Sequence, residues 1–262
     1  PMIARIREAD PALYEEMTRQ AEMEVTVLRP DYSLFFAGRP TSLRLGRGAE
    51  AIVYFNLAGE LFAGAWVPRG FSYAVTSVQF CRSAPGFDEN MARLLALTEG
   101  LEDPYEAEIR ARYTHLPESL PESVRDLARE IAQGSADDYE AMCRIEAWLR
   151  ENCTYTETPG DPPEGVDFVA HFLETREGYC TYYASAMAVL ARCCGLPSRY
   201  VTGYGLARDG ESAYYAARGT SAHAWAEVYF HGVGWVPFDP LNWSAERAQA
   251  AVEAYTDSTA RY

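Results

Sequence analysis

The sequence contains no lysine, so all 23 of its cationic side chains are arginine, against 38 acidic residues. The resulting net charge of −15 argues against a broad nucleic-acid-binding surface, which needs clustered positive charge. No apolar run reaches the ~18 residues of a membrane span. The chain also begins at Pro1 without a basic and then apolar leader, so we expect no signal peptide in it. We therefore expect neither a nucleic-acid partner nor a membrane-spanning segment within these 262 residues.

Cysteine and histidine are too few and too scattered for a disulfide scaffold or a zinc site. The six cysteines form no C-x-x-C motif, and the four histidines do not join them at metal-ligand spacing. An acidic calcium loop is also absent from the sequence. A disulfide between Cys143 and Cys153 is possible, and the sequence does not decide it, because sequence alone cannot establish the geometry of the pair. We expect no metal ion and no other cofactor.

Residues 1–116 are predicted to form a mostly-β accessory module with a leading helix. The helix is expected over residues 10–22, with Pro11 in its first turn. Strand-like segments separated by Gly, Pro and Asn follow at 51–55, 60–67 and 71–80. They predict a small antiparallel sheet or sandwich, which we interpret as a structural or docking module. Residues 81–116 look irregular and acidic, with one short helix.

Residues 117–243 are predicted to form helices followed by an antiparallel sheet, which is an α+β unit. Apolar residues recur at helical spacing in residues 122–134, 137–152 and 179–195. Asp167 is in a position to cap a further short helix. Strand-like runs follow at 198–207, 222–230 and 234–239. We expect residues 244–262 to form a helical tail.

Cys180 lies at the start of the most apolar predicted helix. A thiol at a helix N-terminus faces the positive end of the macrodipole and free backbone N–H groups, and both favour the thiolate. The same N–H groups can stabilise an oxyanion. A buried structural role is the commoner one for a lone cysteine, so position alone does not assign a function to Cys180.

His223 and Asp239 are the candidate base and orienting carboxylate for that thiol. His223 shares one face of its predicted strand with Trp225, Glu227 and Tyr229, so a satisfied core histidine is the alternative interpretation. The short turn at 231–234 makes the last two strands a hairpin, which can place Asp239 beside His223. A carboxylate there would fix the tautomer of the imidazole, as in a nucleophile–base–orienter arrangement.

Three segments together closely resemble the transglutaminase-like core of the papain-like cysteine enzymes. They are GYCTYYASAMAVLARCCGLPSRYVTGY at 178–204, AHAWAEVYF at 222–230 and GWVPFDP at 234–240. The resemblance covers residues 117–243 and implies a papain/transglutaminase-like fold. It also implies that Cys180 is the nucleophile, His223 the base and Asp239 the orienting residue of a catalytic triad.

A narrower resemblance concerns the soluble outer region of bacterial membrane-anchored transglutaminase-like proteins. It rests on three features: the predicted helix pair before the core, the segment DFVAHFL at 167–173, and the segment GFSYAVTS at 70–77. It implies an extracytoplasmic location, at the cell surface or in the periplasm. It further implies that any membrane anchor lies outside this chain.

The resemblance implies a cysteine-dependent acyl-transfer enzyme acting on a carboxamide or peptide carbonyl of a protein or peptide substrate. A thioester at Cys180 would be resolved by an amine or by water, which leaves transglutaminase, deamidase and peptidase outcomes open. The alternative is a non-catalytic scaffold that binds a cell-envelope protein or peptide. Because Cys180, His223 and Asp239 are all present, we favour the enzyme.

Overall fold

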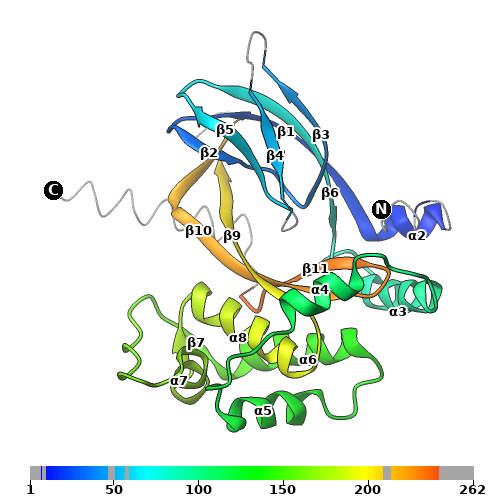
Figure 1. The fold of residues 1–262 in the computed structure, drawn as a ribbon, viewed down its shortest axis with the longest axis vertical. Helices are drawn as coiled ribbons and strands as arrows, with labels where there is room; N and C mark the ends of the chain where they lie inside the picture. Colours follow the sequence, from blue (N-terminus) through cyan, green and yellow to red (C-terminus); the bar gives the residue numbers. More distant parts are fainter. Residues whose placement is uncertain (1–6, 8–9, 47–50, 57–58, 209–213, 242–262) are drawn as a thin grey trace. The chain divides into compact units, whose positions relative to one another are not determined.

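The computed structural model describes residues 7, 10–46, 51–56, 59–208 and 214–241, and the predicted tail at 244–262 lies outside them. The chain divides into two compact units, the first ending at Leu94 and the second beginning at Leu95. Figure 1 shows the strands of the first unit and the mixed helices and strands of the second. The predicted boundary after residue 116 lies within the second unit.

The first unit contains a short helix and two three-stranded antiparallel sheets, with strand orders β1-β6-β3 and β2-β5-β4. Its elements are α2 (Pro11–Met17), β1 (Thr18–Thr26), β2 (Asp31–Leu34), β3 (Arg39–Leu45), β4 (Val53–Phe55), β5 (Leu61–Val67) and β6 (Ser72–Phe80). The mostly-β prediction for this region is confirmed. The predicted helix over 10–22 was too long, because Thr18 already pairs with Phe80 in the β1–β6 ladder.

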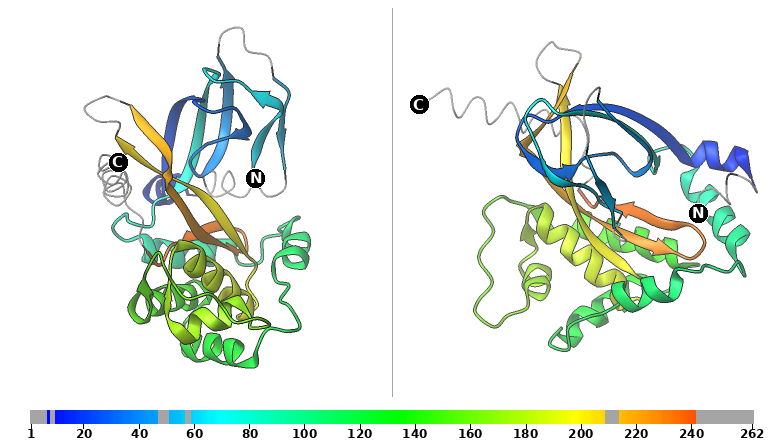
Figure 2. Two further views of the ribbon diagram at one scale, coloured as in Figure 1. Left: turned by 90° about the vertical axis from the view of Figure 1, so that its left-hand side faces the viewer. Right: turned by 45° about the horizontal axis from the view of Figure 1, so that its top comes forward.

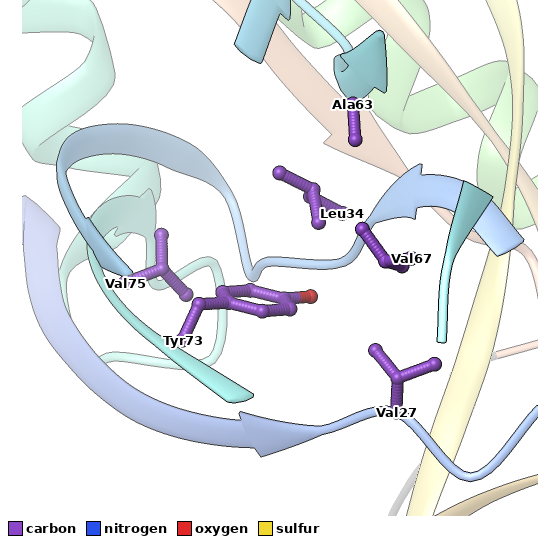
Figure 3. Packing of buried hydrophobic residues seen from close by; sticks show 6 residues of the cluster. All are labelled: Val27, Leu34, Ala63, Val67, Tyr73 and Val75. Carbon is purple, nitrogen blue, oxygen red and sulfur yellow. The ribbon is translucent and has the colours of Figure 1, made fainter. Parts of the chain in front are cut away.

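The core of the first unit lies between its strands, as Figure 3 shows. Its members are the buried residues Val27, Leu34, Ala63, Val67, Tyr73 and Val75. Burial raises the pKa of Tyr73 to about 12, and its hydroxyl both donates to the carbonyl of Phe35 and accepts from the N–H of Phe35. The Tyr73 side chain therefore fixes the segment after β2 without leaving a buried polar atom unsatisfied.

The second unit is an α+β fold, as predicted, in which helices pack on an antiparallel sheet of order β11-β10-β9. Its helices are α4 (Glu106–Tyr113), α5 (Glu122–Ala132), α6 (Asp138–Asn152), α7 (Phe168–Thr175) and α8 (Cys180–Cys193). Its strands are β7 (Thr154–Tyr155), β8 (Glu177–Gly178), β9 (Ser198–Arg208), β10 (Tyr215–Phe230) and β11 (Gly234–Phe238). Helix α3 (Phe87–Thr98) spans the division between the units.

The region 81–116 contains two helices, α3 and α4, so the prediction of one short helix there was wrong. No residue of α4 is buried, which explains why apolar periodicity did not reveal it. Polar contacts hold it instead: Glu106 contacts Nδ1 of His231 at 2.8 Å, and Arg110 donates to the carbonyl of Gly195. These contacts attach α4 to the rest of the second unit.

Helix α8 contacts both β9 and β10 and also packs against α5, α6 and α7 (Figure 2). The alanines at 224 and 226 on β10 and those at 184, 186 and 188 on α8 are all buried. Small side chains let a helix approach a sheet closely. The buried hydroxyl of Ser198, at the start of β9, donates to the carbonyl of Ala188 at 2.6 Å and ties α8 to the sheet.

None of the described helices combines the length and the apolar character that crossing a membrane requires. None of the six cysteines, all of which lie in described residues, is in a disulfide. The bridge between Cys143 and Cys153 that the sequence left open is therefore not formed.

Candidate active site

Cys180 is the first residue of α8, as the sequence predicts, and its side chain is half-buried. Tyr179 precedes it in an extended conformation, and the carbonyl of Tyr179 accepts the N–H of Tyr182 at 2.8 Å. The side chain of Tyr179, the N-cap residue, makes no capping hydrogen bond to this end of the helix. The thiol therefore lies among the backbone N–H groups of the first turn, where negative charge is favoured.

His223 and Asp239 lie side by side through the β10–β11 hairpin. Nε2 of His223, a residue only 6% exposed, is 2.8 Å from Oδ2 of Asp239. Asp239 directly follows β11, whose last paired residue is Phe238, opposite Ala226. The turn between the strands contains Gly232, and β11 begins at Gly234; both glycines have positive φ, which favours glycine. The hairpin predicted from the sequence is thus the element that brings these two side chains together.

The thiol and the imidazole shift each other's pKa in opposite directions. Burial raises the pKa of Cys180, but hydrogen bonding to His223 and to the backbone of Ala224 and Thr181 lowers it, and the net value is below that of an ordinary thiol. Burial lowers the pKa of His223, but Asp239 and Cys180 together raise it to about 9. Both shifts favour a thiolate beside an imidazolium over a neutral pair.

For the other cysteines that show a pKa shift, the pKa is raised rather than lowered. Burial raises the pKa of Cys153 and of Cys194 to about 11. Burial also raises the pKa of Cys193, although nearby Arg125 and Arg129 oppose it. The adjacent pair Cys193 and Cys194 at the end of α8 is therefore a poor nucleophile at neutral pH, consistent with packing.

The ring of Trp225 lies beside His223, with the ring centroids 6.2 Å apart and the planes 21° from parallel. Gly203 is the ladder partner of His223 on β9. A Cβ atom at Gly203 would lie 2.8 Å from Cη2 of Trp225. Glycine is therefore required on β9 so that the indole can cover the strand next to the imidazole.

Two residues that sequence reasoning did not assign contribute to this geometry. Gly178 is buried directly before Tyr179, and Glu146 of α6 accepts a hydrogen bond from the backbone N–H of Asp239 at 2.8 Å. The signal for Glu146 was a carboxylate within the apolar stripe of its helix, between Met142 and Leu149. The signal for Gly178 was its position two residues before the start of α8.

Replacing Gly178 by alanine is expected to lower both stability and the reactivity of Cys180. An added Cβ atom would lie 2.6 Å from Cβ and Cγ of Tyr182, in the first turn of α8, and 3.1 Å from Phe172. Those atoms are close to the backbone and cannot move without shifting the helix start, so we expect a loss of about 1–3 kcal/mol. Urea unfolding and the alkylation rate of Cys180 measure the two effects. An unchanged unfolding midpoint would contradict this prediction.

Among the described residues, no three side chains of His, Cys, Asp or Glu converge in a way that could hold a metal ion. The groups around Cys180 are instead an imidazole, a carboxylate and backbone amides. This set fits nucleophilic chemistry at a thiol with proton transfer by the imidazole.

Part of the chain is similar to known proteins. Residues 125–240 match the model of the transglutaminase-like superfamily. The periplasmic domain of TgpA from Pseudomonas aeruginosa has a similar structure, with a TM-score of 0.65 and 25% identity, over 90% of this chain and 74% of that one. Residues 125–240 thus resemble a transglutaminase-like domain in sequence, and the chain is similar in fold to the periplasmic domain of TgpA.

Two curated proteins are similar in sequence to part of the chain. A protein-glutamine gamma-glutamyltransferase of Pseudomonas aeruginosa is 35% identical over 162 residues, which are 60% of this chain and 24% of that protein. The uncharacterized protein YebA of Bacillus subtilis is 39% identical over 155 residues, which are 56% of this chain and 21% of YebA. The matches thus span under a quarter of the length of these relatives. The predicted roles of Cys180, His223 and Asp239 stay predictions.

Proposed function

We propose that this chain is a cysteine-dependent acyltransferase or hydrolase that acts on a carboxamide or peptide carbonyl of a protein or peptide. The observation that carries the proposal is the position of Cys180 at the start of α8, beside His223, which is itself 2.8 Å from Asp239. The sequence similarity to a protein named as a protein-glutamine gamma-glutamyltransferase supports a carboxamide as the reacting group.

In the first half-reaction, the Cys180 thiolate attacks the carbonyl carbon, and the negative charge moves to the carbonyl oxygen. In this mechanism, backbone N–H groups at the start of α8 stabilise that oxyanion. His223 donates its proton to the leaving nitrogen as the carbon–nitrogen bond breaks. The products are a thioester at Cys180 and free ammonia or an amine.

In the second half-reaction, a primary amine or water attacks the thioester and gives up a proton to His223. The carbon–sulfur bond breaks, the sulfur leaves as thiolate, and the thiolate–imidazolium pair is restored. An amine gives a new amide, and water gives a carboxylic acid. Asp239 accepts a hydrogen bond from Nε2 of His223, so Nδ1 is the nitrogen that exchanges protons with the sulfur.

An extracytoplasmic location is part of the proposal. It is supported by the similarity to a periplasmic domain. In this view the substrate is a protein or peptide at the cell surface or in the periplasm. A membrane anchor, if the whole protein has one, would lie outside this chain.

The test is incubation of the chain with a glutamine-containing peptide, with and without a fluorescent primary amine, followed by intact mass measurement. We expect either incorporation of the amine or a mass gain of one unit from deamidation. Both changes should disappear in Cys180→Ala. A peptide change that persists in Cys180→Ala would reject the enzyme for that donor. The matched control is Cys193→Ala, which removes a thiol that we do not place in the reaction.

We further expect no isopeptide-linked polymers of the pure protein, even where an external amine is incorporated. The chain has no lysine, so it offers no side-chain amine as an acceptor. Denaturing electrophoresis under reducing conditions after long incubation would show this. Reduction-resistant oligomers linked through side-chain amides would contradict the prediction, and adding a lysine-containing acceptor protein provides the positive control.

A further inference from the structure

Glu146 is a carboxylate buried in the helical layer of the second unit. It is 7% exposed and lies on α6 among fully buried Met142, Ile145 and Leu149. Burying a carboxylate is costly unless hydrogen bonds compensate for the lost water. A glutamate at this position is therefore expected to serve a specific purpose that an apolar residue could not serve.

The hydrogen bond of Glu146 to Asp239 joins α6 to the end of β11. Its Oε1 accepts the backbone N–H of Asp239 at 2.8 Å, although the two residues are 93 positions apart. The β10–β11 ladder ends one residue earlier, at Phe238. Strand pairing therefore does not fix the backbone of Asp239, and the contact with Glu146 does.

The side chain of Asp239 is held by two further contacts. Its Oδ1 accepts the backbone N–H of Leu241 at 3.1 Å, and its Oδ2 is 2.8 Å from Nε2 of His223. Backbone and side chain are thus fixed together, with Glu146 as the only one of these contacts that comes from the helical layer. The contacts continue from α6 through Asp239 to the imidazole and the thiol.

We propose that Glu146 is a positioning residue, which holds the backbone of Asp239 so that its carboxylate keeps the imidazole of His223 oriented toward Cys180. This inference rests on the function proposed above. In this proposal Glu146 acts through the backbone of Asp239, so its effect on Cys180 is indirect. Without this contact, Asp239 can move away from Nε2, and the imidazole then stabilises the thiolate less well.

The experiment measures the rate of iodoacetamide alkylation at Cys180 between pH 5 and 9, in wild type, Glu146→Leu and Glu146→Gln, by mass spectrometry of the Cys180 peptide. For Glu146→Leu we expect the acid limb to move up by about one pH unit, which is about a tenfold slower rate at pH 6. For Glu146→Gln we expect a rate within about threefold of wild type, because the amide oxygen can still accept the N–H of Asp239.

The control for a merely structural effect is Ile145→Val, a change at the neighbouring, fully buried position. It should lower the urea midpoint and leave the pH profile of Cys180 unchanged. A folded Glu146→Leu variant with the wild-type profile would overturn the positioning role, and so would failure of Glu146→Leu to fold, because the role would then be structural. If wild-type Cys180 itself lacks an acid-shifted profile, the proposed function fails, which is a different result.

Discussion

Replacing Asp239 by alanine should lower the rate of amine incorporation or hydrolysis by about 10²–10⁴-fold, the contribution typical of proton transfer by a correctly positioned side chain. The change removes the 2.8 Å contact with Nε2 of His223 and, with it, the main interaction that raises the pKa of this imidazole. The fold should be retained, because the Asp239 side chain is 24% exposed and follows the last strand. Initial rates and circular dichroism on the same preparations measure both.

The companion variants make this test specific. Asp239→Asn should cost less, because its amide oxygen can still accept the Nε2 hydrogen. Asp126→Ala is the matched control, since it removes an aspartate that pairs with Arg129 on the exposed face of α5. Equal rates for wild type and Asp239→Ala would reject the triad.

Limiting iodoacetamide at pH 6 should modify Cys180 before any other cysteine. The thiolate is the reactive species, and a thiol with a pKa of about 11, as for Cys153 and Cys194, is about 10⁻⁵ ionised at that pH. The lowered pKa of Cys180 raises its thiolate fraction above that of an ordinary thiol. Peptide mapping of all six cysteines measures the order, and faster reaction at Cys81 or Cys193 would contradict the assignment.

The same assay separates an enzyme from a binding scaffold, which needs no activated thiol. In His223→Ala, the contact that lowers the pKa of Cys180 is lost while its burial remains, so alkylation at pH 6 should slow by about tenfold or more.

Turnover, in contrast to alkylation, should fall above about pH 9, where His223 loses the proton that it gives to the leaving nitrogen. A turnover rate that keeps rising through pH 10 would contradict this role.

Much of the second unit could be predicted from the sequence, because its signals are local. Asp167 caps α7 by accepting the N–H groups of Val169 and Ala170, as its position before an apolar run indicates. The turn with Gly232 and Gly234 likewise marks the hairpin that joins His223 to Asp239. The spatial meeting of that hairpin with Cys180 came from the family resemblance and not from any local pattern.

The elements that were missed depend on contacts between distant residues. Thr18 and its neighbours read as helix, but pairing with β6 makes them a strand. Helix α4 has no apolar face and is fixed by His231 and by the carbonyl of Gly195. Strand β10 begins at Tyr215, earlier than predicted, and an irregularity between Ala217 and Ala222 hides its alternation. No short window of sequence contains these partners.

The β10–β11 hairpin also determines where residues can be inserted between the side chains of the candidate site. Side chains on a strand alternate between faces, so one extra residue between Gly234 and Asp239 would turn the carboxylate away from the imidazole. The interval from His223 to Asp239 is therefore restricted by pleat and register. The interval from Cys180 to His223 contains α8 and β9, and β9 pairs residue by residue with β10, so the same rule applies within that ladder. Natural or engineered insertions should consequently be excluded from β11 and from the paired residues of β9 and β10.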